Sequence, residues 1–522
     1  MDYLVVLIPL LPFIAAAIIG FGFLFNRISD KKDEHISSNT AKNAITLSCV
    51  IAIGLLITDL MGMNPDSITI GKWLGSGNLV VELNFITTGF SVIVAALFSI
   101  VLVIIARFST NYIHAEPGFH RFFFVLSLFS SAMLLLILSG NAIGTFVGWE
   151  LAGLCSYLLI SFAYDRPVAA LNATRVFVTN RIGDAGFILG IALSFYFAGT
   201  INWLNLNELA GSLATPTATV ISLCFVVAAI AKSAQLPFTP WLARAMEGPT
   251  PSSAVFYGAV MIHAGIFLVI LLQPIIEKAP LTMGVLVVIG LFTAVYSFIV
   301  GLTQTDAKSS LCFAISGQLG LMFLECGLGL WELACWHLCA HAIVRSYQVL
   351  TAPSLLRYAY GNPMRPVASK IANKRWLYIA SLQRFWLDPI TDRILVRPIS
   401  GLGHDLDRFD KNIIDSAMGS PVSSNYTISS LTQLEKKLNK KIHGGIQLEF
   451  VRSSGIVGKL FEWIANMMSW FEDRLVLRGI GMDTVDIGRK LGQIANSFEQ
   501  LILKPRYLVL FVFIVLMIAA SI

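Results

Sequence analysis

Long apolar runs recur along this chain of 522 residues, and they constrain its fold more than any other feature. Several approach or exceed the ~18 residues with which an apolar helix spans a bilayer, among them Tyr3 to Phe25, Phe90 to Ala106 and Val285 to Gly301. Only 13% of the residues are charged, against about 25% in soluble proteins. We therefore expect an all-α polytopic bundle of transmembrane helices. Because no basic residue precedes the first run, we expect it to be retained rather than cleaved as a signal peptide.

The apolar runs divide the chain into three regions. About eleven spans end near Leu350, so residues 1–352 are expected to form a transmembrane core. Residues 353–506 contain no convincing span, and apolar and charged residues alternate there at helical spacing, as in Trp376 to Ile399. This pattern predicts amphipathic helices that dock on the membrane surface or on a partner. Residues 507–522 are expected to form a last span.

The basic residues fall on one side of the membrane if the N-terminus lies outside. The outer loops then hold little more than Lys72 and Lys278, which is the asymmetry of the positive-inside rule. Residues 353–506 become cytoplasmic. The basic residues on the inner side are then Arg27, Lys31, Lys32, Lys42, Arg166, Arg175, Arg244 and Lys308.

Two opposite charges stand deep inside apolar runs. Glu150 and Lys232 would each cost at least ~2.5 to 3.5 kcal/mol at the bilayer centre, so each needs a reason to be there. Pro237 and Pro240 follow Lys232 closely and predict a broken membrane helix, a feature that often marks ion sites. We expect a proton relay in which the nearby carboxylate controls whether the buried amine keeps its proton. The alternative is a static buried ion pair.

Asp184 begins an apolar run that continues to Phe197. It could extend the relay of Glu150 and Lys232. Equally, it could be a residue at a helix end that pairs with Arg181 or Arg175. The sequence leaves both interpretations open.

A polar stripe runs down a later apolar segment. His337, His341 and Arg345 recur at intervals of four and so share one helical face, which must turn towards the bundle interior or an aqueous cavity. Histidine exchanges protons near neutral pH, and the alternative role is interhelical hydrogen bonding. His263 is a candidate gate, or else a satisfied core residue.

The cysteines and histidines do not predict a metal site in this chain. All seven cysteines lie in apolar runs, where packing is their default role. Cys335 and Cys339 are close to the histidines in sequence, but residues two apart on a helix point about 200° away from each other. We therefore expect neither a metal nor a cofactor in this chain.

These segments resemble the antiporter-like subunits of respiratory complex I, especially its L-type subunit, and of Mrp cation/proton antiporters. The resemblance covers roughly Gly140 to Leu350. It implies inverted repeats, an ion-translocating function, and places for Glu150 and Lys232 as the charged pair of a first half-channel, with Asp184 near it. The resemblance also adds Lys308, which lies in the last of the strings given below, to the candidate ion path. The strings that carry the resemblance are Gly-Trp149-Glu150-Leu-Ala-Gly-Leu-Cys-Ser-Tyr, Asn180-Arg181-Ile-Gly-Asp184, Ala231-Lys232-Ser-Ala-Gln-Leu-Pro-Phe, Ala245-Met-Glu247-Gly-Pro-Thr-Pro-Ser, His337-Leu-Cys-Ala-His341 and Gln304-Thr-Asp306-Ala-Lys308.

The sequence also departs from that family. After Tyr358 it turns basic and amphipathic, so the second repeat looks truncated, and Arg345 stands where complex I relatives usually have lysine. Arginine cannot plausibly release a proton. These departures resemble the shorter DabB subunits, which work with a large DabA partner. In that partner a zinc ion of the carbonic-anhydrase type would supply hydroxide for carbon dioxide hydration.

Three functions therefore remain open. The first is a subunit that carries protons or sodium ions for inorganic carbon uptake with a DabA-like zinc partner, in a bacterial inner membrane. The second is a proton-pumping L-type subunit of a complex I-like or hydrogenase-linked assembly with iron–sulfur partners. The third is a membrane anchor that conducts nothing. The sequence does not distinguish proton from sodium, nor the direction of flow.

Overall fold

The computed structural model describes residues 2–25, 27–28, 33–77, 79–304, 306–352 and 373–410, together with Met467. The predicted last span at 507–522 lies outside the described residues, as does most of the predicted cytoplasmic region. The chain divides into two compact units, Met1–Val396 and Arg397–Ile522. The first contains the helix bundle, and the described part of the second is chiefly the helix α20 (Arg397–Phe409).

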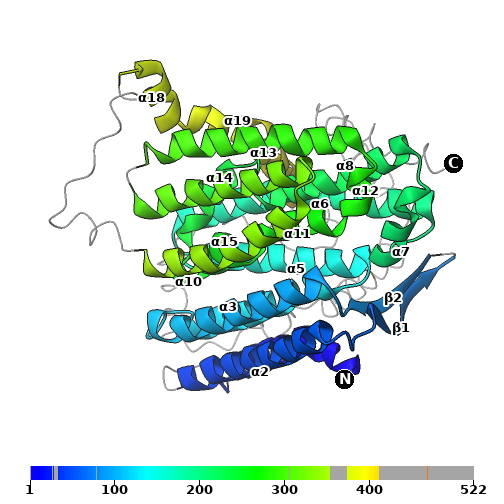
Figure 1. Cartoon of the computed structure of the whole chain (residues 1–522). Helices are drawn as coiled ribbons and strands as arrows, with labels where there is room; N and C mark the ends of the chain where they lie inside the picture. The colour runs from blue at the N-terminus through cyan, green and yellow to red at the C-terminus, as the bar shows by residue number, and fades with distance from the viewer. Residues whose placement is uncertain are drawn as a thin grey trace, which may run out of the picture. The chain divides into compact units, whose positions relative to one another are not determined.

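Ten helices in the described part are long and apolar enough to cross a membrane. A further helix, α15 (Trp331–Thr351), is of similar length but more polar. Figure 1 shows these helices side by side, and the predicted all-α polytopic bundle is confirmed. In chain order the ten are η1 (Asp2–Val6) with α1 (Leu7–Leu24), α2 (Glu34–Leu60), α3 (Phe90–Tyr112), α4 (Phe119–Leu138), α5 (Ala142–Ile160), α6 (Pro167–Ala198), α8 (Thr215–Lys232), the segment Thr250–Leu271, α13 (Pro280–Gly301) and α14 (Ala307–Gly327).

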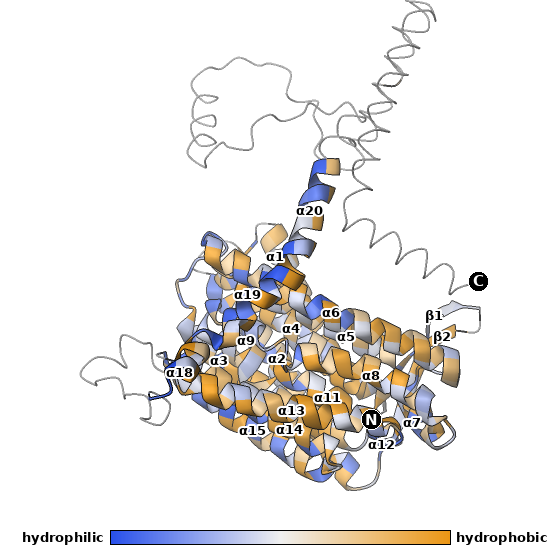
Figure 2. Cartoon of the chain, turned by 90° about the horizontal axis from the view of Figure 1, so that it is seen from above, coloured by the Kyte–Doolittle hydropathy of each residue, from blue (hydrophilic) through white to orange (hydrophobic). Residues whose placement is uncertain are grey.

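The outward faces of the bundle are apolar, as a lipid environment requires. On α13, Phe292 and Phe298 are 61% and 68% exposed. Figure 2 shows hydrophobic residues along most of the helices, with hydrophilic residues concentrated around α18 (Arg375–Leu382) and α19 (Leu387–Thr391). Because lipid tails are as apolar as these side chains, such exposure costs nothing within a bilayer.

A β-hairpin stands at one end of the bundle and was not predicted from the sequence. Its strands are β1 (Ser67–Ser76) and β2 (Leu79–Ile86), which pair antiparallel with Ser67 opposite Ile86. Figure 1 shows the hairpin at the same end of the bundle as α7 (Trp203–Glu208) and α12 (Gln273–Glu277), and we call this the hairpin end. The 3₁₀ turn η3 (Leu209–Gly211) follows α7.

Two helices are interrupted near the middle of the bundle. The first break follows α8, where the chain unwinds before α9 (Pro240–Arg244) and the turn η4 (Ala245–Glu247). The second lies in the segment Thr250–Leu271, where nearly every residue is buried, so that its irregular backbone faces protein rather than lipid. That segment consists of α10 (Thr250–Ser253), the π-helical η5 (Ala254–Ala259), the 3₁₀ turn η6 (Met261–His263) and α11 (Ala264–Leu271).

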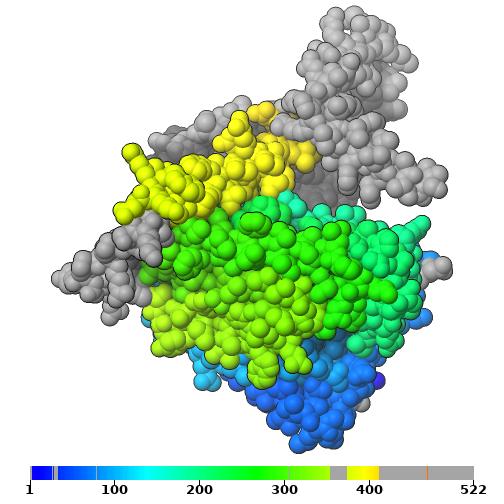
Figure 3. Space-filling model, turned by 45° about the horizontal axis from the view of Figure 1, so that its top comes forward, coloured from blue at the N-terminus to red at the C-terminus, as the bar shows by residue number. Residues whose placement is uncertain are grey.

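A lateral segment after α15 lies across the bundle (Figure 3). It consists of α18, the turn η7 (Arg384–Trp386), α19 and the π-helical η8 (Asp392–Val396). The segment is helical but is not one continuous helix, because the residues of η7 adopt φ angles of 51°, 52° and 54° and turn the chain. A hydrogen bond of 2.7 Å between Ser381 and Thr303 holds α18 to the bundle.

Candidate functional site

Arg181 joins the two carboxylates of the candidate site. It lies on α6, where its Nη1 donates to Oε2 of Glu150 on α5 at 2.5 Å. Its Nε lies 2.9 Å from Oδ2 of Asp184, three residues further along the same helix. Since a guanidinium presents several donors in a fixed planar fork, one arginine can hold both carboxylates at once.

Trp149 joins Asp184 to Lys232. The Trp149 indole Nε1 donates to Oδ1 of Asp184 at 2.8 Å, and the Lys232 ammonium donates to the Trp149 backbone oxygen at 3.0 Å. The same ammonium lies 4.9 Å from the centre of the indole ring, a cation–π distance. Lys232 is only 1% exposed. The four side chains of Glu150, Arg181, Asp184 and Lys232 therefore form one charge cluster around Trp149.

Gly153 makes room for the two cations of the charge cluster. A Cβ atom at this position would lie 3.4 Å from Lys232 Nζ and 3.5 Å from Arg181 Nη2. Both cations therefore approach the same point on α5, one turn beyond Trp149. Glycine leaves that point free for the two head groups.

The chain breaks directly after Lys232, and the freed polar groups find partners. The Trp241 indole donates to the Ala231 oxygen at 2.8 Å, and the Leu236 amide donates to Thr293 Oγ1 at 3.0 Å. Ser233 Oγ donates to the Ile262 oxygen at 2.7 Å, which connects this break to the second broken helix. The backbone that places Lys232 is thus satisfied inside the protein, as a membrane interior demands.

A second polar group runs along α15. His341 Nδ1 lies 2.8 Å from Nε2 of His263, which belongs to the second broken helix. Arg345 Nε donates to His341 Nε2 at 3.3 Å. Because arginine can only donate, a neutral His341 carries its proton on Nδ1 and donates it to His263.

The same helix pairs His337 with a carboxylate that the sequence analysis did not single out. His337 Nδ1 lies 2.9 Å from Glu325 Oε1, and His337 Nε2 lies 2.9 Å from Gln318 Oε1. Both partners come from α14. The His337 and His341 rings are 6.1 Å apart between centres. We call Glu325, His337, His341, His263 and Arg345 the histidine row.

Comparison with known proteins identifies the family of this chain. Residues 139–363 match the family described as NADH:quinone oxidoreductase/Mrp antiporter, TM, and residues 73–123 match the N-terminus of complex I chain 5. The chain belongs to this family of antiporter-like membrane subunits. The predicted family is thereby confirmed, while its narrower DabB character is not shown by these matches.

Relatives and solved structures agree with that placement. NAD(P)H-quinone oxidoreductase chain 5 of Synechocystis sp. is 33% identical over 362 residues, which cover 67% of this chain and 52% of the relative. Subunit 5 of Nephroselmis olivacea chloroplasts is 34% identical and covers 73% of this chain and 59% of that one. The antiporter-like chain thus spans about half the length of these relatives.

Two solved assemblies share the fold. The Mrp complex of Dietzia sp. aligns with a TM-score of 0.59 and 18% identity over 99% of this chain and 62% of that one. An archaeal respiratory complex, the membrane-bound sulfane sulfur reductase, aligns with a TM-score of 0.57 and 20% identity over 66% of this chain and 70% of that one. At these identities the likeness shows the fold alone.

The structure of this antiporter-like subunit changes two details of the predicted pairing. Glu150 forms its ion pair with Arg181 rather than with Lys232, although the Lys232 charge still interacts with Asp184 and Glu150. Asp184 does not stand at a helix end, because α6 begins at Pro167 and runs on to Ala198. Its predicted pairing with Arg181 is present in the middle of that helix.

The remaining predicted residue, Lys308, bonds to a residue outside the charge cluster and the histidine row. It stands at the start of α14, and its Nζ donates to Thr250 Oγ1 at 2.7 Å at the head of the second broken helix. The Tyr112 hydroxyl lies 2.9 Å from the same oxygen.

Sequence reasoning missed the central positions of Trp149 and Arg181 and the role of Glu325 as a partner. The signal for Glu325 was present, because it is a carboxylate inside the apolar run that became α14. Arg181 was considered only as a partner for Asp184. Among the described residues, no group of three or more His, Cys, Asp or Glu side chains is arranged to hold a metal ion.

Proposed function

We propose that this antiporter-like subunit translocates protons as part of a larger membrane assembly. The observation that carries the proposal is Lys232, an ammonium that is 1% exposed, placed at a helix break and electrostatically coupled to Asp184 and Glu150. A buried amine in such a place keeps its proton only while the carboxylates stay near it. A small displacement at the break is therefore enough to release or capture a proton.

The chemistry of the charge cluster favours a proton over a sodium ion. Arg181 and Lys232 can only donate hydrogen bonds, so neither offers a lone pair to a metal ion. Both cations approach the same point near Gly153. A sodium ion would need several oxygen ligands and would be repelled by two neighbouring cations. The histidine row, in contrast, consists largely of groups that exchange protons.

Exposure of the charge cluster supports a partner subunit. In the isolated chain the Arg181 and Glu150 side chains are 34% and 27% exposed, halfway along transmembrane helices. Leaving this ion pair against lipid would be costly, so polar protein or water is expected to cover it. The relatives named above are subunits of NAD(P)H-quinone oxidoreductases, and we propose a complex I-like, quinone-linked assembly as the first candidate.

A second candidate is inorganic carbon uptake with a DabA-like partner that would hold the zinc ion. Arg345 favours it, because a fixed cation bonded to His341 differs from the lysine usual in complex I relatives. In either case we propose that the chain lies in a bacterial inner membrane with the hairpin end outside. On this placement residues 353–506 are cytoplasmic, and residues 507–522 form a last span.

Purification of the tagged full chain with its native partners tests the proposal. Iron–sulfur or quinone-reacting companions support the first candidate, and a large zinc protein supports the second. The purified assembly is then reconstituted in vesicles that carry a proton-sensitive dye. An assembly that is active in its coupled reaction but moves no protons would leave the chain as a mere anchor and contradict the proposal.

A further inference from the structure

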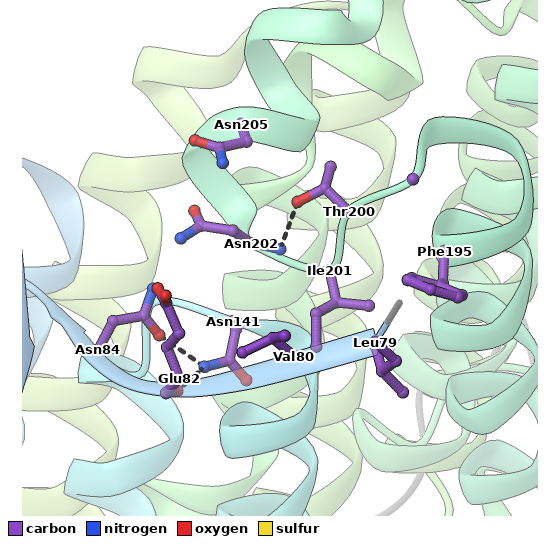
Figure 4. A pocket seen from close by; sticks show the side chains of 11 residues that line it. Leu79, Val80, Glu82, Asn84, Asn141, Phe195, Thr200, Ile201, Asn202 and Asn205 are labelled. Carbon is purple, nitrogen blue, oxygen red and sulfur yellow. Dashed lines mark hydrogen bonds between the residues drawn. The ribbon is translucent and has the colours of Figure 1, made fainter. Parts of the chain in front are cut away.

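A polar pocket opens at the hairpin end, apart from the charge cluster. It has a volume of about 240 Å³ and lies between the hairpin, the start of α5 and the segment that joins α6 to α7. Figure 4 shows Glu82, Asn84 and Asn141 close together on one side and Asn202 on another. Asn141 Nδ2 donates to Asn84 Oδ1 at 2.5 Å. The amide groups and the one carboxylate suit water and cations.

The charge cluster lies about two turns along α5 from this pocket. Asn141 lines the pocket, Thr145 follows one turn later, and Trp149 of the charge cluster follows after another turn. These eight residues correspond to about 12 Å along a helix axis. On α6, Phe195 lines the pocket and Asp184 lies three turns away from it. On both helices a residue that lines the pocket is separated from the charge cluster by two or three turns.

Four aromatic rings fill the layer between them. The Phe187 ring centre lies 5.2 Å from that of Trp149 and 5.2 Å from that of Phe225, and the Phe225 centre lies 5.5 Å from that of Trp203. Each of the four side chains is at most 1% exposed. We call Trp149, Phe187, Trp203 and Phe225 the aromatic plug.

The aromatic plug is tightly fitted to the helices around it. A Cβ atom at Gly190 would lie 2.9 Å from the Phe225 ring, so this ring fills the space between α6 and α8. The Trp203 indole donates to Thr145 Oγ1 at 2.9 Å, which fixes α7 against α5. A constriction filled by apolar rings stops ions because water cannot accompany them through it.

We propose that the aromatic plug is the barrier that closes the charge cluster towards the pocket, and that the pocket is the vestibule on the far side of this barrier. The proposal deepens the proposed function, since a pump needs such a barrier to prevent leakage. Trp149 belongs to both parts: its ring packs on Phe187 while its Nε1 holds Asp184. A shift of Asp184 would therefore reach the barrier directly.

Passive flux measures the barrier separately from pumping. The full assembly, purified with its native partners, is reconstituted in vesicles, and proton entry is followed under an imposed pH gradient without any energy source. We expect Phe187→Ala with Phe225→Ala to raise the passive flux several-fold and Phe187→Leu to raise it less. Phe123→Ala is the matched control, because it removes a ring that is 0% exposed on α4, outside the aromatic plug.

A further substitution distinguishes an opened path from general damage. Glu82→Gln removes the carboxylate that lines the pocket, so it should lower the passive proton flux of the leaky double variant. A leak through damaged lipid contacts should stay unchanged. A folded double variant with wild-type passive flux, or a leak equal to that of Phe123→Ala, overturns the barrier. A tight wild-type assembly that never pumps contradicts the proposed function instead, while a leaky double variant still supports the barrier.

Discussion

Arg181 donates to Glu150 at 2.5 Å, in the place that the sequence analysis assigned to Lys232. The two cations therefore have different roles. Arginine stays charged under all conditions and can fix the carboxylate in position, while the lysine remains available to change its protonation. Because one cation stays charged and the other can lose its proton, the charge cluster has two protonation states.

Lys232→Met should abolish most of the proton translocation. Methionine keeps the length of the side chain but carries no proton, and the loss of a group that transfers protons typically lowers a rate by about 10² to 10⁴-fold. The measurement is pumping by the reconstituted assembly. Lys72→Met, on the exposed strand β1, is the control and should pump normally. Full pumping by Lys232→Met would remove the lysine from the mechanism.

Arg181→Lys should destabilise the protein although it keeps the charge. A lysine cannot hold Glu150 and Asp184 together in the way that the guanidinium fork does. Because both partners of the Glu150 pair are partly exposed, we expect a loss of about 1 to 3 kcal/mol, below the 3 to 5 kcal/mol of a fully buried pair. Thermal unfolding in detergent measures it. Asp184→Asn in the same chain should restore part of the loss.

His263→Phe should interrupt the histidine row. The phenyl ring fills the site but cannot accept the proton that His341 Nδ1 donates, and an unpaired buried donor costs about 1 to 3 kcal/mol. We expect slower pumping together with reduced thermal stability. His120→Phe serves as the comparison, because it also removes a buried histidine, whose partner Ser37 lies outside the row. Equal pumping by both variants would argue for a purely structural His263.

Asp388→Arg should release the lateral segment from α9. Asp388 accepts from Arg244 Nε at 2.9 Å and lies 3.7 Å from Arg384, so the reversed charge repels both. Hydrogen exchange of residues 373–396 should become faster. Combining it with Arg244→Asp restores one attraction and should slow the exchange again. Each partly exposed pair contributes at most about 1 kcal/mol, so global stability should change little.

Most of the charged residues were predictable from the sequence, as was the pairing of Asp184 with Arg181, but the partners of Glu150 and Lys232 were not. Glu150, Lys232 and His341 were recognisable because an ionisable residue in an apolar run is costly. Trp149 was passed over, since its importance comes from contacts with Asp184 and Lys232 on other helices. The hairpin also escaped prediction, although the residues from Val81 to Phe85 alternate between apolar and polar as in a strand. The strands are short and lie between long apolar runs that dominate this part of the sequence.

By itself the sequence determined that this is a bundle of membrane helices with charges inside it. Transfer of apolar side chains into lipid adds up residue by residue along each run, so length and composition were sufficient. Only the tertiary structure decided that Arg181, rather than Lys232, bonds Glu150, and that aromatic rings separate the charges from the pocket. These features depend on distances between segments that are remote along the chain, and electrostatic attraction and ring packing change over a few ångströms.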